Sequence, residues 1–197
     1  METMTPNSII SPKNGIKIRL PKSSIFIILV PAMLLFFIGG TLLFLYIWDE
    51  ISFPAFDRHV RQHWTYAGVF LNLLGASLCY TLIQWVFFYF SQGRKMDKIG
   101  WRFQFNATGY YPAKAIPLKK FRPVLLLPAL LVGVLPLIHG YCTGNGGIYT
   151  FGLMGLLLSS YDVTYWFKLR RFDGEDLVQG GKKPYEATVI RRNYGKK

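Results

Sequence analysis

Cysteine, histidine and acidic side chains are scarce in this sequence. Its 197 residues include two cysteines, three histidines and ten aspartates and glutamates. The cysteines, Cys79 and Cys142, are far apart, so they support neither a disulfide framework nor a zinc knuckle. The sequence also contains no internal repeat and no low-complexity segment, and its length suggests one domain. These shortages exclude repeat proteins and small disulfide-bonded domains.

Long apolar runs are what the sequence has in abundance. Hydrophobic residues make up 51% of the chain and aromatic residues 17%. The apolar residues gather in four blocks, at 24–48, 65–90, 123–142 and 148–167. Each block reaches the roughly 20 residues that a helix needs to cross a bilayer core of about 30 Å. Because unpaired backbone polar groups are too costly in lipid, the sequence predicts an all-α membrane protein with four transmembrane helices.

The predicted membrane domain covers residues 23–192 as a single unit. Residues 1–22 precede it as a flexible basic tail, and residues 193–197 follow it as a basic end. The first apolar block is too long for the apolar region of a signal peptide, and it ends in YIWDE rather than at a small-residue cleavage site. We therefore expect this block to be retained as a helix.

Positive charge is unevenly distributed, and its distribution predicts the membrane topology. The net charge is +13, and the basic residues concentrate in both tails and in the loop between the second and third blocks. The loop between the first two blocks has only Arg58 and Arg61, and the turn CTGNGG has none. Basic segments favour the cytoplasmic side, so we predict a multi-pass protein of the cell membrane with both termini in the cytoplasm. Contact with anionic lipid explains the same charge, and no pattern indicates a nucleic-acid partner.

Two segments outside the blocks show the alternation that is typical of short strands. In KIGWRFQFNATGYYP, apolar residues alternate with other types from 99 to 106. This predicts a strand or half of a hairpin between the second and third helices, ended by a turn at GYYP. The C-terminal stretch YEATVIRR favours another short strand. In the third block, Pro123 suits a helix start, whereas Pro128 and Pro136 should kink the helix or cap broken pieces.

Asp162 is the only acidic residue within the four blocks. An acid at mid-membrane costs about 2.5–3.5 kcal/mol on insertion scales, and such residues are usually functional or paired. At 1.5 Å per residue, Asp162 and Gln84 lie roughly 8 and 9 Å from the cytoplasmic ends of their helices. Tyr80 and Thr81 lie one turn deeper, and Tyr80 shares a helix face with Gln84 because they are four residues apart. A site between the second and fourth helices is therefore geometrically possible.

Other polar groups have simpler interpretations. Hydroxyl and amide side chains often hydrogen-bond between membrane helices, at roughly 0.6–2 kcal/mol each. His139 lies near the opposite end of its block, at the wrong depth to join the acid, which favours a hydrogen-bonded interfacial histidine. His59 and His63 are four residues apart and could bind a metal from one helix face, but only Asp57 offers a third ligand.

Three stretches, taken in order, resemble the DUF3267 family, multi-pass membrane proteins regarded as zincin peptidases. The first is KIGWRFQFNATGYYP, a strand-like segment. The second is PLKKFRPVLLLPALLVGVLPLIHG, a helix with two prolines eight residues apart. The third is FGLMGLLLSSYDVTYWFKLRRFDGEDLV, in which an aspartate precedes a helix end. The likeness covers about residues 65–192.

The resemblance implies a zinc site that this chain has lost. Such families place H-E-x-x-H on the helix before the strand, where two histidines bind zinc and the glutamate activates the bound water. Here YTLIQ stands in that place, with Tyr80 and Gln84 at the histidines and Thr81 at the glutamate, and Asp162 matches the distant acidic ligand. Tyrosine and glutamine are poor zinc ligands, and threonine has no carboxylate. We therefore expect no bound zinc, no other cofactor, no intact catalytic residue, and a non-catalytic pseudopeptidase.

The retained polar residues have an alternative role. Tyr80, Thr81 and Gln84 are expected to form a hydrogen-bond network with Asp162, which would explain how the membrane tolerates the acid. The expected partners are the lipid bilayer and a membrane-protein partner or segment in the former substrate cleft. Two other interpretations stay open. One is an active metallopeptidase with atypical ligands such as His139 and Asp162, and the other is a small non-enzymatic accessory or immunity protein of the membrane.

Overall fold

The structure is a computed structural model that describes residues 15–19, 22–48, 54, 57–58, 61, 65–94, 99–102, 109–180 and 186–191. Its long helical elements are α1 (Lys22–Trp48), α3 (Tyr66–Ser91), α4 (Leu118–Pro128), the π-helical η3 (Ala129–Val134), α5 (Leu135–Thr143) and α6 (Gly146–Leu169). Its strands are β1 (Gly15–Arg19), β2 (Ile99–Arg102), β3 (Gly109–Pro112), β4 (Ile116–Pro117), β5 (Leu177–Gly180) and β6 (Glu186–Ile190). The chain is mostly helical, as the sequence predicted.

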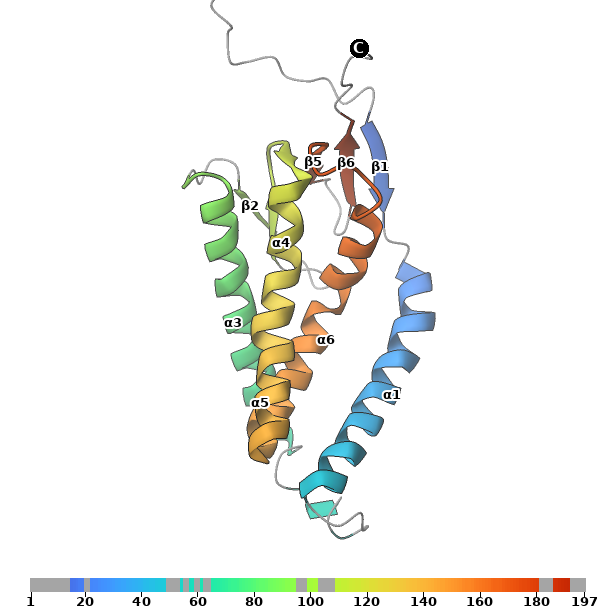
Figure 1. The fold of residues 1–197 in the computed structure, drawn as a ribbon, viewed down its shortest axis with the longest axis vertical. Helices are drawn as coiled ribbons and strands as arrows, with labels where there is room; N and C mark the ends of the chain where they lie inside the picture. Colours follow the sequence, from blue (N-terminus) through green and yellow to red (C-terminus); the bar gives the residue numbers. More distant parts are fainter. Residues whose placement is uncertain are drawn as a thin grey trace, which may run out of the picture.

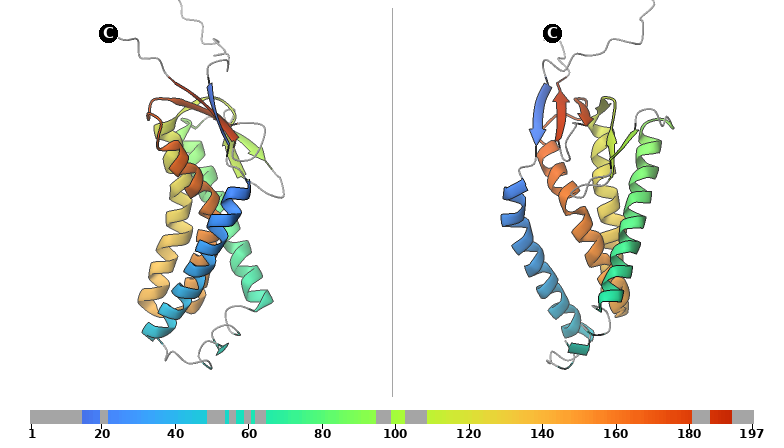
Figure 2. Two further views of the ribbon diagram at one scale, coloured as in Figure 1. Left: turned by 90° about the vertical axis from the view of Figure 1, so that its right-hand side faces the viewer. Right: turned by 180° about the vertical axis from the view of Figure 1, so that it is seen from behind.

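Three helical columns form the bundle, and a fourth helix lies at its edge. Elements α4, η3 and α5 follow one another without a break and pack against both α3 and α6. Helix α1 runs beside α6 and contacts the bundle less than the other helices do (Figures 1 and 2). All the strands gather at one end of the bundle, which we call the sheet end. The opposite end, where a turn joins α5 to α6, is called the turn end.

The sheet is larger than the short β-like segments that the sequence predicted. Strands β1, β6, β5 and β4 form, in this order, one antiparallel sheet, and β2 pairs with β3 in a separate hairpin. The sheet packs on the helix ends, and the core between them is built from buried residues of every layer: Ile18, Phe88, Ile116, Leu118, Phe121, Val124, Leu125, Tyr165, Leu169, Val178, Ala187 and Val189. This core fixes the sheet end of α3 against that of α6.

Two predictions about the segments outside the helices are wrong. Residues 15–19 are not part of a flexible tail, because they form β1, the edge strand that pairs with β6 along its whole length. GYYP is not a turn but strand β3, which pairs antiparallel with β2. Residues 103–108, which connect the two strands, lie outside the described residues. The strand predicted in YEATVIRR is confirmed as β6, whose residues are mostly buried against the helices.

The third helix begins five residues before the predicted start at Pro123. Leu118 and Phe121 are buried in the core, and their burial extends the helix past a proline that offers no N–H to Lys119. The loop between α6 and β5 caps this start. The carbonyls of Asp176 and Gly174 accept hydrogen bonds from the backbone N–H groups of Leu118 and Lys119, both at 2.8 Å. These bonds satisfy two of the N–H groups that a helix start leaves unpaired.

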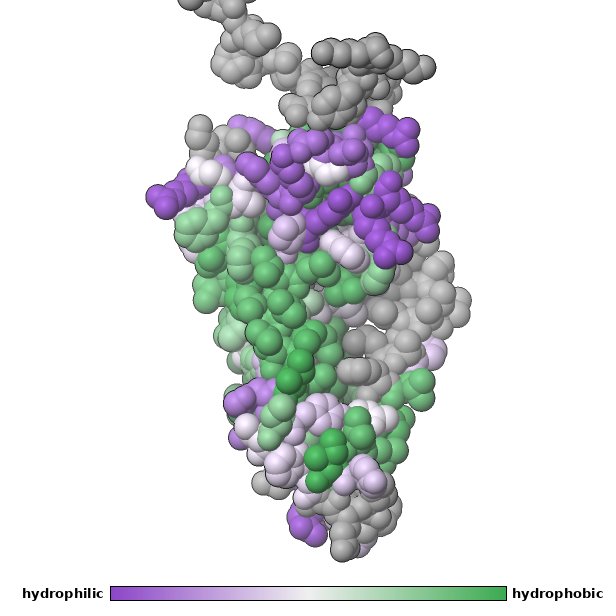
Figure 3. Space-filling view, viewed as in Figure 1, coloured by the Kyte–Doolittle hydropathy of each residue, from purple (hydrophilic) through white to green (hydrophobic). Residues whose placement is uncertain are grey.

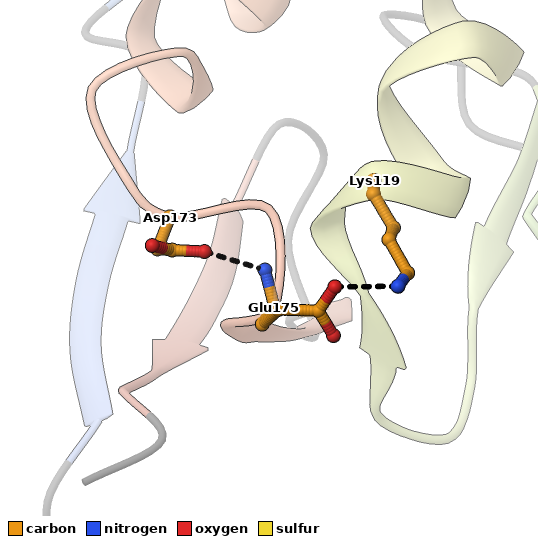
Figure 4. A network of polar contacts seen from close by, with 3 residues as sticks. All are labelled: Lys119, Asp173 and Glu175. Carbon is orange, nitrogen blue, oxygen red and sulfur yellow. Dashed lines mark hydrogen bonds and ion pairs between the residues drawn. The ribbon is translucent and has the colours of Figure 1, made fainter. Parts of the chain in front are cut away.

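Side chains tie the same loop to α4 (Figure 4). The Lys119 ammonium pairs with the Glu175 carboxylate, and Asp173 Oδ1 accepts a hydrogen bond of 2.9 Å from the Glu175 backbone N–H. Arg122 donates to the carbonyl of Leu169, at 2.8 Å, and to that of Phe172. Because a cation at a helix C-terminus is favourable, Arg122 links α4 to the end of α6 both electrostatically and by hydrogen bonds.

The two inner prolines of the third helix neither break it nor leave it a regular α-helix. The π-helical residues of η3 directly follow Pro128, and Pro136 directly follows the first residue of α5. Pro136 has no N–H for the Val132 carbonyl, four residues earlier. The backbone of α6 lies close to η3 at Val132, as shown by Gly155: a Cβ added there would lie 2.2 Å from the Val132 carbonyl oxygen. Small residues that admit a neighbouring backbone in this way are typical of packed membrane helices.

Two helical segments, Tyr66–Ser91 and Leu118–Thr143, are long and apolar enough to cross a membrane. In the described part of α1, a shorter apolar stretch covers Phe37–Trp48. Figure 3 shows a broad apolar band over the helices, below a hydrophilic cap at the sheet end. The exposed apolar residues of α3 include Phe70, Leu74 and Leu78. An exposed apolar surface of this extent is unusual for a soluble monomer.

Candidate functional site

Asp162 lies near the sheet end of α6, on the face that packs against α3. Asp162 is 9% exposed, and Gln84 on α3 is 5% exposed. Tyr80, one turn before Gln84, is half-buried on the same face. The helical spacing and the similar depth that the sequence indicated therefore do bring these three side chains together.

One carboxylate oxygen of Asp162 accepts hydrogen bonds from two side chains of α3. The Tyr80 hydroxyl donates a short hydrogen bond to Asp162 Oδ2, and Gln84 Nε2 donates to the same oxygen at 3.3 Å. Hydrogen bonds to a charged acceptor are stronger than those between neutral groups. Across the described ranges, no Lys, Arg or His forms an ion pair with Asp162. The acid is thus stabilised by two neutral donors rather than by a cation.

Gln84 extends the network to the β-hairpin. Its Oε1 accepts a hydrogen bond of 3.3 Å from the backbone N–H of Tyr110, in the middle of β3. Tyr110 also packs against the core beneath the sheet. One amide side chain therefore joins α3, α6 and the hairpin, and this link was not predicted, because no local pattern relates residue 84 to residue 110.

Thr81 does not join the network, contrary to the prediction. In the part of the chain that the structure describes, no hydrogen bond joins the Thr81 side chain to Asp162. The reason is helical geometry, since neighbouring residues point about 100° apart and Tyr80 and Gln84 already face the acid. Thr81 is half-buried beside them.

His139 does not reach this site. His139 is exposed on α5 near the turn end, where its carbonyl accepts a bond of 2.8 Å from the Thr143 hydroxyl. Asp57 forms an ion pair with Arg61 at 2.7 Å. His59 and His63 lie outside the described residues. The predicted difference in depth between His139 and Asp162 is confirmed, since the two lie toward opposite ends of the bundle.

A second polar cluster, which no sequence pattern indicated, holds α1 against the bundle near the turn end. Thr41 and Tyr149 hydrogen-bond through their hydroxyls at 3.2 Å, and the Tyr141 hydroxyl donates to the Gly40 carbonyl. Trp48 Nε1 donates to the Tyr141 carbonyl at 2.7 Å, and Phe44 stacks on Tyr149 with ring centroids 4.7 Å apart. The cluster explains the position of α1 and contains no charged group.

The donor set around Asp162 does not fit zinc. Zinc sites in proteins use imidazole, thiolate and carboxylate ligands, usually three or four of them. Here one carboxylate faces a phenol and an amide, and both of these donate hydrogen bonds to it. Nowhere in the described ranges do three or more His, Cys, Asp and Glu side chains form a group that could hold a metal. The chemistry that the site supports is hydrogen bonding between helices.

Comparisons of the chain with protein-family models, with curated proteins and with solved structures found no match.

Proposed function

We propose that the chain spans the membrane four times, with α1, α3, the α4–η3–α5 column and α6 as the spans. Aromatic side chains support this. Trp85, Tyr89 and Phe90 lie at the sheet end of α3, and Tyr66, which is 99% exposed, begins this helix at the turn end. Tyr66 and Trp85 are separated by about 29 Å at 1.5 Å per residue, close to the thickness of a bilayer core. Such rings prefer the two membrane interfaces.

The charge distribution supports a cytoplasmic sheet end. Exposed cations stand at the sheet end of three helical columns: Arg94, Lys120, Arg170 and Arg171. At the turn end, the α5–α6 connection around Gly144 carries no charged residue. The rule that basic segments stay inside then places the sheet, both tails and the β-hairpin in the cytoplasm.

For a chain placed in the membrane in this way, we infer that it is a non-catalytic relative of the membrane zincins of the DUF3267 type. The observation that carries the inference is the convergence of positions 80 and 84 on one oxygen of Asp162. Two residues four apart on a helix, aimed at a distant acid, have the arrangement that H-E-x-x-H enzymes use for three metal ligands. In this chain the two positions carry donors for the acid in place of zinc ligands, and position 81 has no general base.

The function that this arrangement favours is binding, with a bilayer-embedded segment of another protein as the partner. The network holds α3 and α6 together at the depth where a peptidase would act, and Gln84 connects it to the cytoplasmic hairpin. A rigid, catalytically silent site of this kind can hold a partner without cleaving it. Stoichiometric zinc in the purified protein would contradict the proposal.

The membrane placement predicts opposite accessibility for the two ends of the α4–η3–α5 column. Single cysteines would replace Lys120 or Thr143, both exposed, in a background with Cys79→Ser and Cys142→Ser. In intact cells, a membrane-impermeant maleimide should label the Thr143→Cys protein at once and the Lys120→Cys protein only after permeabilisation. Because both cysteines lie on one helical column, each variant serves as the control for the expression and folding of the other. Equal labelling of the two in intact cells would refute the topology.

A further inference from the structure

The exposed cations at the sheet end all lie at or next to the end of a helix. They stand at the ends of three helical columns: Arg94 after α3, Lys120 in the first turn of α4, and Arg170 and Arg171 after α6. We call these four residues the cation collar. Among the described residues, none of the four is paired with a carboxylate, whereas the nearby Lys17 and Lys119 are paired with Glu186 and Glu175. Within the described part of the chain, no carboxylate neutralises the positive charge that the collar presents.

Two collar arginines lie over exposed aromatic rings. The guanidinium carbon of Arg94 is 5.8 Å from the ring centroid of Phe90, and that of Arg170 is 5.0 Å from the centroid of Phe167. Phe90 and Phe167 are 58% and 49% exposed. A cation over a ring face is an attractive contact, and it holds each guanidinium next to an apolar group that prefers hydrocarbon.

The backbone contributes to the position of Arg94. Its φ is 62°, in the left-handed region that residues other than glycine rarely adopt, and it follows Gly93 with a φ of 68°. These two residues end α3, and the Arg94 N–H donates a hydrogen bond of 3.0 Å to the Tyr89 carbonyl in the last turn of the helix. The arginine thus remains beside the helix end instead of continuing away from it.

We propose that the cation collar binds the phosphates of anionic phospholipids in the cytoplasmic leaflet. The proposal rests on the membrane placement inferred above. In that placement the two phenylalanine rings lie at the interface between the hydrocarbon core and the headgroups, and the guanidinium groups stand at headgroup depth. Arginine binds phosphate oxygens through two parallel N–H bonds, and each cation near an anionic surface strengthens the attraction. An acidic partner protein would bind farther from the bilayer and would not need the exposed rings.

Lipid selectivity of the purified full-length protein tests the proposal. The probe is an equimolar mixture of phosphatidylglycerol and phosphatidylcholine with identical acyl chains, and native mass spectrometry measures the ratio of bound lipids. Wild type should prefer phosphatidylglycerol, and Arg94→Gln with Arg170→Gln should reduce that preference about fivefold for each arginine removed. The matched control, Arg58→Gln with Arg61→Gln, removes the same charge from the connection between α1 and α3 and should keep the preference.

Equal binding of the two lipids by wild type, or an equal loss in both double variants, would overturn the proposal. If the Arg94→Gln and Arg170→Gln protein does not fold, the wild-type preference must still fall as salt rises, and a salt-independent preference would also overturn it. The cysteine labelling distinguishes the lipid-binding role of the collar from the membrane placement on which it rests. Labelling as predicted without lipid preference refutes only the collar, whereas equal labelling at both ends refutes the membrane placement itself.

Discussion

Removing both donors to Asp162 is expected to destabilise the protein by about 3 kcal/mol, because hydrogen bonds to a charged group contribute roughly 1.5–3 kcal/mol each. The change is Tyr80→Phe together with Gln84→Leu, which leaves a buried carboxylate without its two partners. The loss would be measured as a shift in the unfolding midpoint in detergent micelles. The control is Thr81→Val, which keeps the shape of a half-buried neighbour that does not bond to Asp162, and it should change stability by less than about 0.5 kcal/mol.

Adding Asp162→Leu to that double variant should restore most of the lost stability. A buried acid is costly mainly when its partners are missing, and replacing the acid and both of its donors by apolar groups of similar size is often close to neutral. The Tyr110 N–H loses Gln84 Oε1 in the double and the triple variant alike, so the comparison between them is unaffected. The triple variant thus distinguishes a specific network from general damage to the packing of α3 against α6. A triple variant less stable than the double variant would contradict the network, as would a double variant as stable as wild type.

A single methyl group at Gly155 is expected to cost about 2–3 kcal/mol. The Gly155→Ala Cβ would lie 2.2 Å from the Val132 carbonyl oxygen and 2.6 Å from its carbon, and backbone atoms inside a packed helix pair cannot rotate away. Helix α6 would have to move off η3, and this movement would also disturb the contact of α6 with α3. The measurement is the free energy of unfolding in micelles, with retained helix content as a check on folding.

The matched control for Gly155 is Gly39 on α1. A Cβ there would meet nothing within 4 Å. The same glycine-to-alanine change at this position should be neutral or stabilise the helix by about 0.5–1 kcal/mol, since alanine loses less backbone entropy on folding. Similar effects at the two positions would show that the close approach between α6 and η3 does not contribute to stability.

The convergence of Tyr80, Gln84 and Asp162 could be predicted because it depends only on local regularities. Helical rise sets the depth of each residue along its helix, and the spacing of residues sets the helix face on which each side chain lies. The four apolar blocks predicted the long helices for the same reason, and the ends differ by only a few residues in three of them. The exception is α4, where burial of Leu118 and Phe121 outweighs the preference of Pro123 for a helix start.

Contacts between distant segments could not be predicted from the sequence. Strand β1 alternates Ile16 and Ile18 with Lys17 and Arg19, but five residues are too few to establish a strand without a partner. It becomes a strand because β6 offers it an edge. The Thr41–Tyr149 bond joins residues 108 positions apart, and the Gln84–Tyr110 bond joins a helix to a hairpin. In each case the side chains are common in membrane proteins, and only the tertiary arrangement selects their partners.

The most direct test of the account is the zinc content of the purified protein. Zinc per chain would be measured by mass spectrometry for wild type, for Asp162→Ala, and for a variant with Tyr80→His, Thr81→Glu and Gln84→His. We expect no stoichiometric zinc in the first two proteins and close to one zinc per chain in the third, because two imidazoles would then face the Asp162 carboxylate. About one zinc per wild-type chain, lost in Asp162→Ala, would contradict the account and indicate a metalloenzyme with unrecognised ligands.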